Sequence, residues 1–331
     1  MLWIKVMMST VSLRKLGSSD LLLSPIGLGC WQFSQGRGMI GKYWAVLPQE
    51  DIADIVRAAL DGGINWFDTA EAYGGGASER ALAAALKKLG RTSADVAVAT
   101  KWTPFLRKAK SIEATIGRRL DNLGGFRIDL HQIHNPFSIS GLKAQIAAMG
   151  RLADEGKIRF VGVSNFGAKR MLQAHKLMAG SGRAIVSNQV HYSLLHRKIE
   201  SSGVLDAARE HGISIIAYSP LEQGILTGRF HDDPRLIHKL SMARRSRSPF
   251  RPRGLVRSRP VIEALREIGG RRGATPPQVA LAWLVQFSGE TVFAIPGASK
   301  AAQAKDNASA LNIRLTKDEL DHLDRVSAGY K

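Results

Sequence analysis

Short apolar runs alternate with amphipathic stretches along most of this chain. Apolar residues three or four positions apart predict helices with one buried face, whereas near-continuous apolar runs predict strands that are buried on both faces. We expect strands at residues 26–28, 64–67, 96–100, 128–133, 158–163, 185–190, 213–217 and 291–295. The helices expected after them cover residues 48–60, 78–89, 112–123, 141–155, 168–178, 204–211, 276–287 and 301–311, and a last one covers 315–326.

Eight strand–helix units in succession favour a closed parallel barrel over an open sheet. The predicted fold class is therefore α/β, a (β/α)8 TIM barrel, preceded by a β-hairpin at residues 12–24 whose turn is Gly-Ser-Ser-Asp. No change in composition marks a linker, so residues 1–331 are interpreted as a single domain, with residues 1–11 as a ragged leader.

One segment after the seventh strand does not follow the alternation. Residues 235–259 contain nine Lys or Arg residues and no Asp or Glu, with Ser, Pro and Gly scattered among them. Such a run is typical of a mobile loop, and we expect a flexible basic loop within residues 229–259. Its place after a barrel strand puts it on the face where the strands end, where it could fold over a bound anion.

The composition, 44% hydrophobic and 23% charged over 331 residues, is typical of a globular protein. No run approaches eighteen apolar residues, so no membrane partner is expected. Cys30 is the only cysteine, which excludes internal disulfides and thiolate-rich metal sites; no metal site is predicted, and a cytoplasmic location is expected. The net charge of +19 indicates attraction for anions such as phosphorylated cofactors, or contact with nucleic acid.

Four polar side chains stand where consecutive strands end. The second strand leads to Asp68 and, through a glycine-rich loop, to Tyr73. The third strand ends at Lys101 and the fourth at His134. Because the carboxyl ends of neighbouring parallel strands lie about 4.8 Å apart, we expect these groups to meet at one rim of the barrel.

Such a quartet suits proton transfer to a carbonyl oxygen. The Lys101 ammonium should lower the pKa of Tyr73, while Asp68 fixes the lysine. His134 can donate a hydrogen bond that orients the carbonyl, which becomes an alkoxide when it receives a hydride. No side chain supplies hydride, so the chemistry requires a nicotinamide cofactor.

Each residue by itself has a simpler explanation. Asp68 could be a helix cap or a structural ion pair, Tyr73 a surface loop residue, and His134 a strand-end histidine with satisfied hydrogen bonds. The hypothesis of a site depends on all four lying at the same ends of neighbouring strands.

Seven motifs follow one another along the chain: WFDTAEAYG, ATKW, QIHNP, GVSNF, NQVHYS, AYSPL and IPGAS. In this order they resemble the aldo-keto reductase family over residues 12–326, nearer to bacterial members and potassium-channel β-subunits than to the aldose-reductase branch. The resemblance implies a TIM barrel, NADPH-dependent carbonyl reduction and a catalytic tetrad of Asp68, Tyr73, Lys101 and His134. In that tetrad the tyrosine donates the proton, the lysine and aspartate tune it, and the histidine positions the substrate.

The resemblance also implies contacts with the cofactor. Ser164, Asn165 and Gln189 would bind the nicotinamide carboxamide, and the ring of Tyr218 would stack on the nicotinamide. One loop would line the pyrophosphate and a second would hold the adenine and the 2′-phosphate. Together with Trp31 and Asp68, the remaining expected cofactor contacts are Ser219, Pro220, Leu221, Gly224, Gly297, Ser299, Lys300, Gln303 and Asn307.

Two departures from the family pattern concern the 2′-phosphate. Gln303 stands where many relatives carry an arginine, and Asp306 replaces a common glutamate. Lys300 would then carry the phosphate preference, with Arg229 and the basic segment assisting. NADPH is the expected cofactor and NADH an alternative.

Two further sequence patterns concern the cofactor and the substrate. Residues 36–41 fit G-x-G-x-x-G, but no strand leads directly into them, so a Rossmann dinucleotide site is not predicted there. Several aromatic residues are expected in loops near the rim and predict an apolar or aromatic substrate pocket: Trp31, Phe33, Tyr43, Trp44, Trp102 and Phe137.

The sequence therefore predicts an NADPH-dependent oxidoreductase that reduces aldehydes or ketones, with a small-molecule carbonyl as its substrate. The alternative is a cofactor-bound regulatory or scaffold subunit resembling the potassium-channel β-subunits, which the intact tetrad disfavours. Nucleic-acid binding by the basic surface is the least favoured hypothesis; its affinity would fall steeply with salt.

Overall fold

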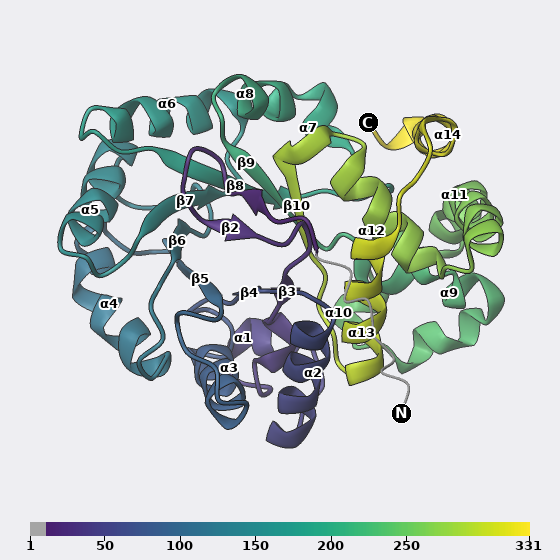
Figure 1. Ribbon diagram of the computed structural model, residues 1–331, viewed down its shortest axis with the longest axis horizontal. Helices are drawn as coiled ribbons and strands as arrows, with labels where there is room; N and C mark the ends of the chain where they lie inside the picture. Colours follow the sequence, from purple (N-terminus) through teal and green to yellow (C-terminus); the bar gives the residue numbers. More distant parts are fainter. Residues whose placement is uncertain (1–10) are drawn as a thin grey trace, which may run out of the picture.

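The computed structural model describes residues 11–331, so the expected leader lies outside the described residues except for its last position. Eight parallel strands form the predicted barrel (Figure 1). Each strand pairs with its neighbour in the chain, and bridges from Ile26 to Ala294 and from Gly29 to Gly297 join the first strand to the last. The strands are β3 (Leu28–Gly29), β4 (Trp66–Asp68), β5 (Ala97–Trp102), β6 (Leu130–Ile133), β7 (Phe160–Ser164), β8 (Ile185–His191), β9 (Ser214–Tyr218) and β10 (Val292–Ile295).

Large apolar side chains fill the end of the barrel where the strands begin. Trp66, Leu130 and Phe293 belong to one buried cluster there. The predicted hairpin, formed by β1 (Arg14–Lys15) and β2 (Leu22–Leu23), adds Leu16 and Leu23 to the same cluster and covers this end. The chemistry is left to the opposite end, where the strands finish.

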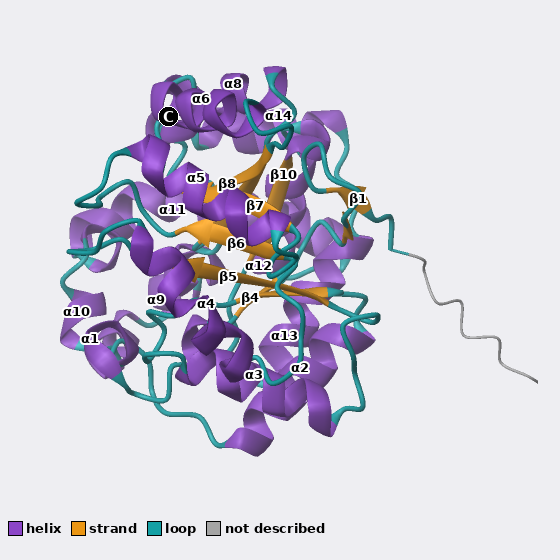
Figure 2. Cartoon of the chain, turned by 90° about the vertical axis from the view of Figure 1, so that its left-hand side faces the viewer, coloured by secondary structure: helices purple, strands orange, loops and turns teal. Residues whose placement is uncertain are grey.

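Helices surround the barrel, as Figures 1 and 2 show. Their buried faces carry the apolar residues whose spacing predicted them; in the first long helix Ile52, Ile55 and Val56 are buried. Thr275 and Thr316 each begin a helix with a capping box, which satisfies amide groups at the helix start. The long helices are α2 (Gln49–Asp61), α3 (Ala77–Lys88), α4 (Lys110–Asn122), α5 (Leu142–Asp154), α6 (Ala168–Ala179), α8 (Val204–Glu210), α12 (Pro276–Gln286), α13 (Ala301–Ser309) and α14 (Lys317–Val326).

Shorter helical turns lie in the connections. The α-helical ones are α1 (Gly38–Gly41), α7 (Lys198–Ser201) and α9 (Arg229–Asp232). The 3₁₀ turns are η1 (Trp31–Phe33), η2 (Glu222–Thr227), η5 (Gly289–Thr291), η6 (Ala310–Asn312) and η7 (Ala328–Tyr330).

The basic segment after β9 differs from the sequence-based expectation of a loop. It contains η3 (Pro234–Lys239), α10 (Met242–Arg245) and η4 (Ser248–Phe250), and from Pro252 it is part of the 21-residue helix α11 (Pro252–Arg272). Leu255, Ile262 and Leu265 are buried at helical spacing in α11. The prediction was wrong for residues 252–259 because the many arginines obscured this apolar face.

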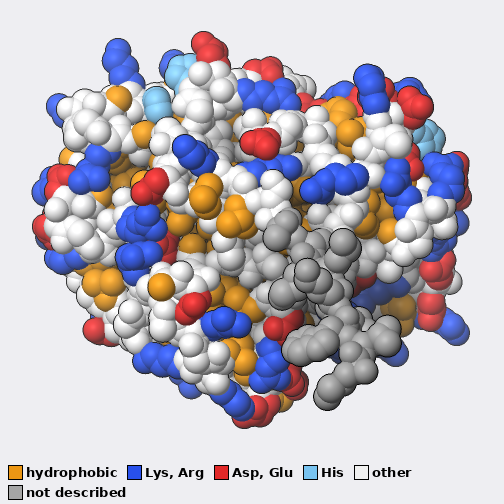
Figure 3. Space-filling view, in the orientation of Figure 1, with side chains coloured by type: hydrophobic (Ala, Val, Ile, Leu, Met, Phe, Trp, Pro, Cys, Tyr) orange, Lys and Arg blue, Asp and Glu red, His pale blue; other side chains and the backbone are white. Residues whose placement is uncertain are grey.

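On the face seen in Figure 3, Lys and Arg side chains lie among Asp and Glu side chains and do not gather into one basic stripe. This mixed pattern does not favour nucleic-acid binding on that face. Among residues 11–331, no helix combines the length and the apolar character needed to cross a bilayer.

Candidate active site

A cavity of about 970 Å³ opens where the barrel strands end. Asp68, Tyr73 and His134 line it, and every residue expected from the sequence to contact the cofactor lies in its wall. Lys101 lies behind this wall and is fully buried. The structure therefore brings the predicted residues together around one space.

Lys101 is held at the end of β5 by three oxygen acceptors. Its Nζ donates to Asp68 Oδ1 at 2.5 Å, to the Thr69 carbonyl at 2.8 Å and to Tyr73 Oη at 3.4 Å. Burial disfavours the ammonium, but the charge of Asp68 and the Tyr73 oxygen outweigh that cost, and the pKa of Lys101 is raised. The lysine is therefore a permanent cation beside the phenol.

The second carboxylate oxygen of Asp68 is also occupied. Gln132 Nε2 donates to Asp68 Oδ2 at 3.1 Å, and Gln189 Nε2 donates to it at 2.9 Å. Sequence reasoning missed Gln132. A signal was present, because Gln132 is a polar residue inside an apolar strand and stands in register with Lys101 on the neighbouring strand.

Tyr73 lies in the loop between β4 and α3. Its ring stacks on that of Trp31 at 6.1 Å between centroids and meets the His134 ring edge-on at 5.8 Å. The loop turns at Gly74, whose φ is +69° and where an added Cβ would lie 2.2 Å from the Ser34 carbonyl oxygen. Only glycine fits this close approach.

The electrostatics of Tyr73 correct a prediction. We expected Lys101 to lower the pKa of the phenol, but burial raises it more than the lysine lowers it, and the pKa of Tyr73 is raised overall. Tyr73 is therefore a neutral phenol at neutral pH, which is the form that can donate a proton.

His134 is neutral as well. Removal from water and, secondarily, the charge of Lys101 lower its pKa to about 3. Its Nδ1 lies 3.4 Å from the Thr103 hydroxyl oxygen. If that hydroxyl donates to Nδ1, the imidazole proton is on Nε2, where it can be donated to a ligand.

The side chains expected at the nicotinamide also bond to one another. The Ser164 hydroxyl donates to the Gln189 carbonyl at 2.9 Å, and the Asn165 amide donates to the His134 carbonyl at 3.2 Å. Tyr218 Oη donates to Asn165 Oδ1 at 3.0 Å, and its ring is stacked on that of His191 at 5.3 Å. These bonds fix the side chains before any ligand arrives.

Backbone strain gathers around the same cavity. Asn165, Ser219 and Gln223 line it with φ values of 62°, 50° and 54°, in the left-handed region that non-glycine residues rarely adopt. Such conformations cluster at ligand sites, where the surrounding structure imposes them.

The far end of the cavity is formed by the loop after β10 and the start of α13. Lys300 precedes the first turn of α13. Gln303 Oε1 accepts bonds from the Ser299 amide and hydroxyl, and Asn307 donates to the Gly297 carbonyl. The Asp306 carboxylate accepts hydrogen bonds from the Thr275 hydroxyl and the Gln278 side-chain amide at the start of α12.

Arg229 and Arg244 are among the arginines in the cavity wall that have no acidic partner among the described residues. Burial lowers the pKa of both Arg229 and Arg244, and no carboxylate offsets it. The Arg244 guanidinium lies 4.4 Å above the Trp44 ring and donates to the Gln223 carbonyl at 2.9 Å, while its Nε is buried without a partner. Partly buried cations without a counter-ion suit the phosphates of a dinucleotide.

The predicted aromatic pocket is smaller than expected. Trp31 and Tyr43 stack at 4.8 Å, and both line the cavity together with Trp44. Phe33, Trp102 and Phe137 do not line it. Phe33 and Trp102 belong to the buried core cluster, and Trp102 is the last residue of β5. Phe137 is 73% exposed outside the cavity.

These features define a parallel β/α-barrel protein with a buried lysine–aspartate pair and a neutral tyrosine at the carboxyl end of its strands. Residues 25–328 match the sequence model of the aldo/keto reductase family. The chain belongs to this family of oxidoreductases.

Named relatives agree with this assignment. The "uncharacterized oxidoreductase Rv2298" of Mycobacterium tuberculosis is 38% identical over 312 residues, which is 93% of this chain and 91% of the relative. Among solved structures, the glycerol dehydrogenase AKR11B4 from Gluconobacter oxydans superposes with a TM-score of 0.82 at 26% identity, covering 98% of this chain and 97% of that one. A thermostable aldo-keto reductase, Tm1743, in complex with the inhibitor epalrestat, superposes with a TM-score of 0.73 at 27% identity, covering 95% of this chain and 99% of that one.

Proposed function

We propose that the protein reduces aldehydes or ketones to alcohols with NADPH, and that Tyr73 donates the proton. The observation that carries this proposal is the contact between a neutral phenol and a buried cation: Tyr73 Oη lies 3.4 Å from Lys101 Nζ. Tyr73 lines a cavity large enough for a dinucleotide and a small substrate, and Lys101 lies behind the wall of that cavity.

The residues act on a carbonyl oxygen placed between Tyr73 and His134. Tyr73 transfers its proton to that oxygen as negative charge develops on it. Lys101 stabilises the phenolate that remains, and Asp68 keeps the lysine in place. His134, as a neutral donor, stabilises the developing alkoxide and orients the carbonyl.

The wall of the cavity fits NADPH. When bound, the cofactor would supply the hydride. Tyr218 offers a ring already held parallel to His191, and Ser164, Asn165 and Gln189 surround the position expected for the carboxamide. Arg229 and Arg244 offer cations to the pyrophosphate, which both cofactors carry. Lys300 offers a cation to the 2′-phosphate, which only NADPH carries, and this supports NADPH over NADH.

The substrate side of the cavity favours a carbonyl with an apolar or aromatic body. Trp31, Tyr43 and Trp44 form a cluster of rings that reaches Tyr73 through Trp31. A flat or apolar substrate group would be stabilised against such rings by dispersion attraction and by burial of its apolar surface. The buried state of the lone Cys30 is compatible with the cytoplasm, which we propose as the compartment.

The test is a screen of NADPH oxidation over short aliphatic, aromatic, sugar-derived and pyridoxal-type carbonyls, repeated with NADH. We expect turnover with NADPH, highest for aromatic aldehydes. Tight NADPH binding without turnover of any carbonyl would contradict the proposal and favour a regulatory subunit.

A further inference from the structure

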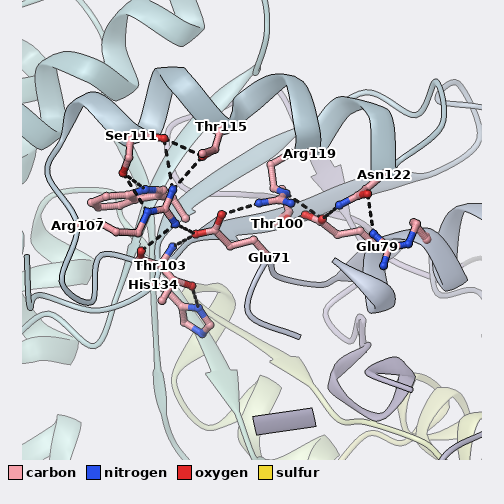
Figure 4. A network of polar contacts seen from close by, with 12 residues as sticks. Glu71, Glu79, Thr100, Thr103, Arg107, Ser111, Thr115, Arg119, Asn122 and His134 are labelled. Carbon is pink, nitrogen blue, oxygen red and sulfur yellow. Dashed lines mark hydrogen bonds and ion pairs between the residues drawn. The ribbon is translucent and has the colours of Figure 1, made fainter. Parts of the chain in front are cut away.

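A buried carboxylate that has no part in the proposed chemistry lies between Asp68 and Tyr73 in the sequence. Glu71 is 9% exposed. Its side chain accepts the Thr103 amide at 2.5 Å, Arg119 Nη1 at 2.5 Å and the Arg107 guanidinium (Figure 4). One side chain in the loop that carries Tyr73 is thus tied to the end of β5 and to α4.

The backbone of Glu71 strengthens the same connection. Its amide donates to the Lys101 carbonyl at 3.3 Å, and its carbonyl accepts the Gly76 amide at 2.9 Å. The loop residue is therefore bound through backbone and side chain to the strand that carries Lys101. The position of the Tyr73 loop relative to Lys101 depends on these bonds.

The same contacts reach His134 by a second route. Thr103, whose amide is held by Glu71, places its hydroxyl 3.4 Å from His134 Nδ1. The His134 amide donates to the Trp102 carbonyl at 2.9 Å, next to Thr103 in the chain. Glu71 consequently lies one or two bonds from the elements that carry Tyr73, Lys101 and His134.

The charges around Glu71 are balanced and largely removed from water. Arg119 is 4% exposed and joins Glu71 to Glu79, which is fully buried and also bonded to Thr100 and Asn122 (Figure 4). Two carboxylates and two guanidinium groups leave no net charge. Any arrangement in which one of these groups loses its partner would leave an uncompensated charge in the interior. The network therefore has one favoured arrangement, in which all four charged groups are paired.

We propose that Glu71 is a positioning residue for carbonyl reduction, holding Tyr73 against Lys101 and holding Thr103 against His134 without touching the substrate. This inference rests on the proposed function. Small displacements of a proton donor are costly, since a shift of about 1 Å can reduce turnover by about 100-fold. The carboxylate acts through geometry, so its loss should affect kcat and leave cofactor affinity unchanged.

The test compares Glu71→Gln with Glu113→Gln. Glu113 forms an exposed pair with Arg151 at 2.7 Å on the outer side of α4, so its replacement controls for loss of one acid–arginine pair. For each variant, NADPH binding is titrated by fluorescence to give the dissociation constant and the number of competent sites. Reduction of the best carbonyl substrate and oxidation of the corresponding alcohol are then measured across pH, per competent site.

We expect Glu71→Gln to lower kcat per competent site by about 10- to 100-fold, with an NADPH dissociation constant within about twofold of wild type. The alkaline rise of alcohol oxidation should move to higher pH, because a Tyr73 displaced from Lys101 gives up its proton less readily. Glu113→Gln should match wild type in both measurements. A Glu71→Gln protein with wild-type kcat per competent site and an unchanged pH profile would overturn the proposal.

Arg107→Met keeps the inference falsifiable if Glu71→Gln does not fold. Arg107 is the more exposed of the two arginine partners, and Arg119 still contacts Glu71 after its removal, so the charge left unbalanced lies nearer to solvent. A loss in kcat of about threefold or more, in the same direction and without a change in NADPH affinity, is expected. A change in melting temperature alone would show a purely structural network. Wild-type protein without turnover would instead refute the proposed function itself.

Discussion

The contact between Lys101 and Tyr73 leads to a quantitative prediction. Replacing Lys101 by Met removes the cation next to the phenol, but it leaves Asp68 buried without its counter-ion. The double variant Lys101→Met with Asp68→Asn avoids that charge and preserves hydrogen-bonding groups for Gln132 and Gln189. It is therefore the better perturbation, because the effect on Tyr73 is separated from a loss of folding.

The magnitude follows from the distance. At 3.4 Å between Lys101 Nζ and Tyr73 Oη, an effective dielectric constant of about 20 gives an attraction of about 5 kcal/mol between ammonium and phenolate. Loss of the buried Asp68 charge, which itself raises the pKa of Tyr73, offsets part of this. We expect the pKa of Tyr73 to be higher in the double variant than in wild type, because the lost Lys101 charge affects the phenol more than the lost Asp68 charge.

The assay is alcohol oxidation with NADP⁺, because this direction requires the Tyr73 phenolate to accept a proton. At fixed pH below the tyrosine pKa, the double variant should oxidise the alcohol about 100-fold more slowly than wild type. Lys110→Met, at the exposed start of α4, serves as the lysine-removal control and should have no effect. A double variant that binds the cofactor and keeps its oxidation rate within about threefold would refute this account of how the phenol is tuned.

Three further predictions test other parts of the site. Because the pKa of His134 is about 3, the rate of carbonyl reduction plotted against pH should show no inflection between about pH 5 and 8. An inflection near the ordinary histidine pKa that disappears in His134→Asn would contradict the role of His134 as a neutral donor. Lys300→Met should weaken NADPH binding by about tenfold, or about 1.4 kcal/mol, and leave NADH binding unchanged in fluorescence titrations. Equal weakening of NADPH and NADH binding would show that Lys300 does not contact the 2′-phosphate. Gly74→Ala should abolish most turnover, because the new Cβ would lie 2.2 Å from the Ser34 carbonyl oxygen. Gly75→Ala, at φ +61° with open space around it, should lose only about 1 kcal/mol of stability and keep its turnover. Similar kcat values for the two variants would refute the steric argument.

Much of the fold could be predicted from the sequence because each barrel strand is buried on both faces. Such strands form apolar runs that stand out from the helices between them. The bounds were less accurate: residues 64–67 were predicted where β4 is Trp66–Asp68. Helix α11 was not predicted at all, because its buried Leu255 lies among arginines and the charge density concealed the helical period.

The placement of the four central residues was also accessible, since the carboxyl ends of parallel strands always meet at one rim. The residues that hold these four in place could not be predicted from the sequence. Glu71 bonds with Arg107 and Arg119, which are 36 and 48 positions away, and no local pattern reports such pairs. The raised pKa of Tyr73 depends on how completely the fold removes water from the phenol, which a sequence does not contain.

The role of Tyr73 is the central claim, and Tyr73→Phe tests it most directly. The measurement is carbonyl reduction at saturating NADPH, with NADPH binding determined on the same samples. The account predicts a loss of turnover of about 1,000-fold with NADPH affinity within about twofold of wild type, because only the proton donor is removed. A Tyr73→Phe protein that binds NADPH and keeps more than about a tenth of wild-type turnover would contradict it.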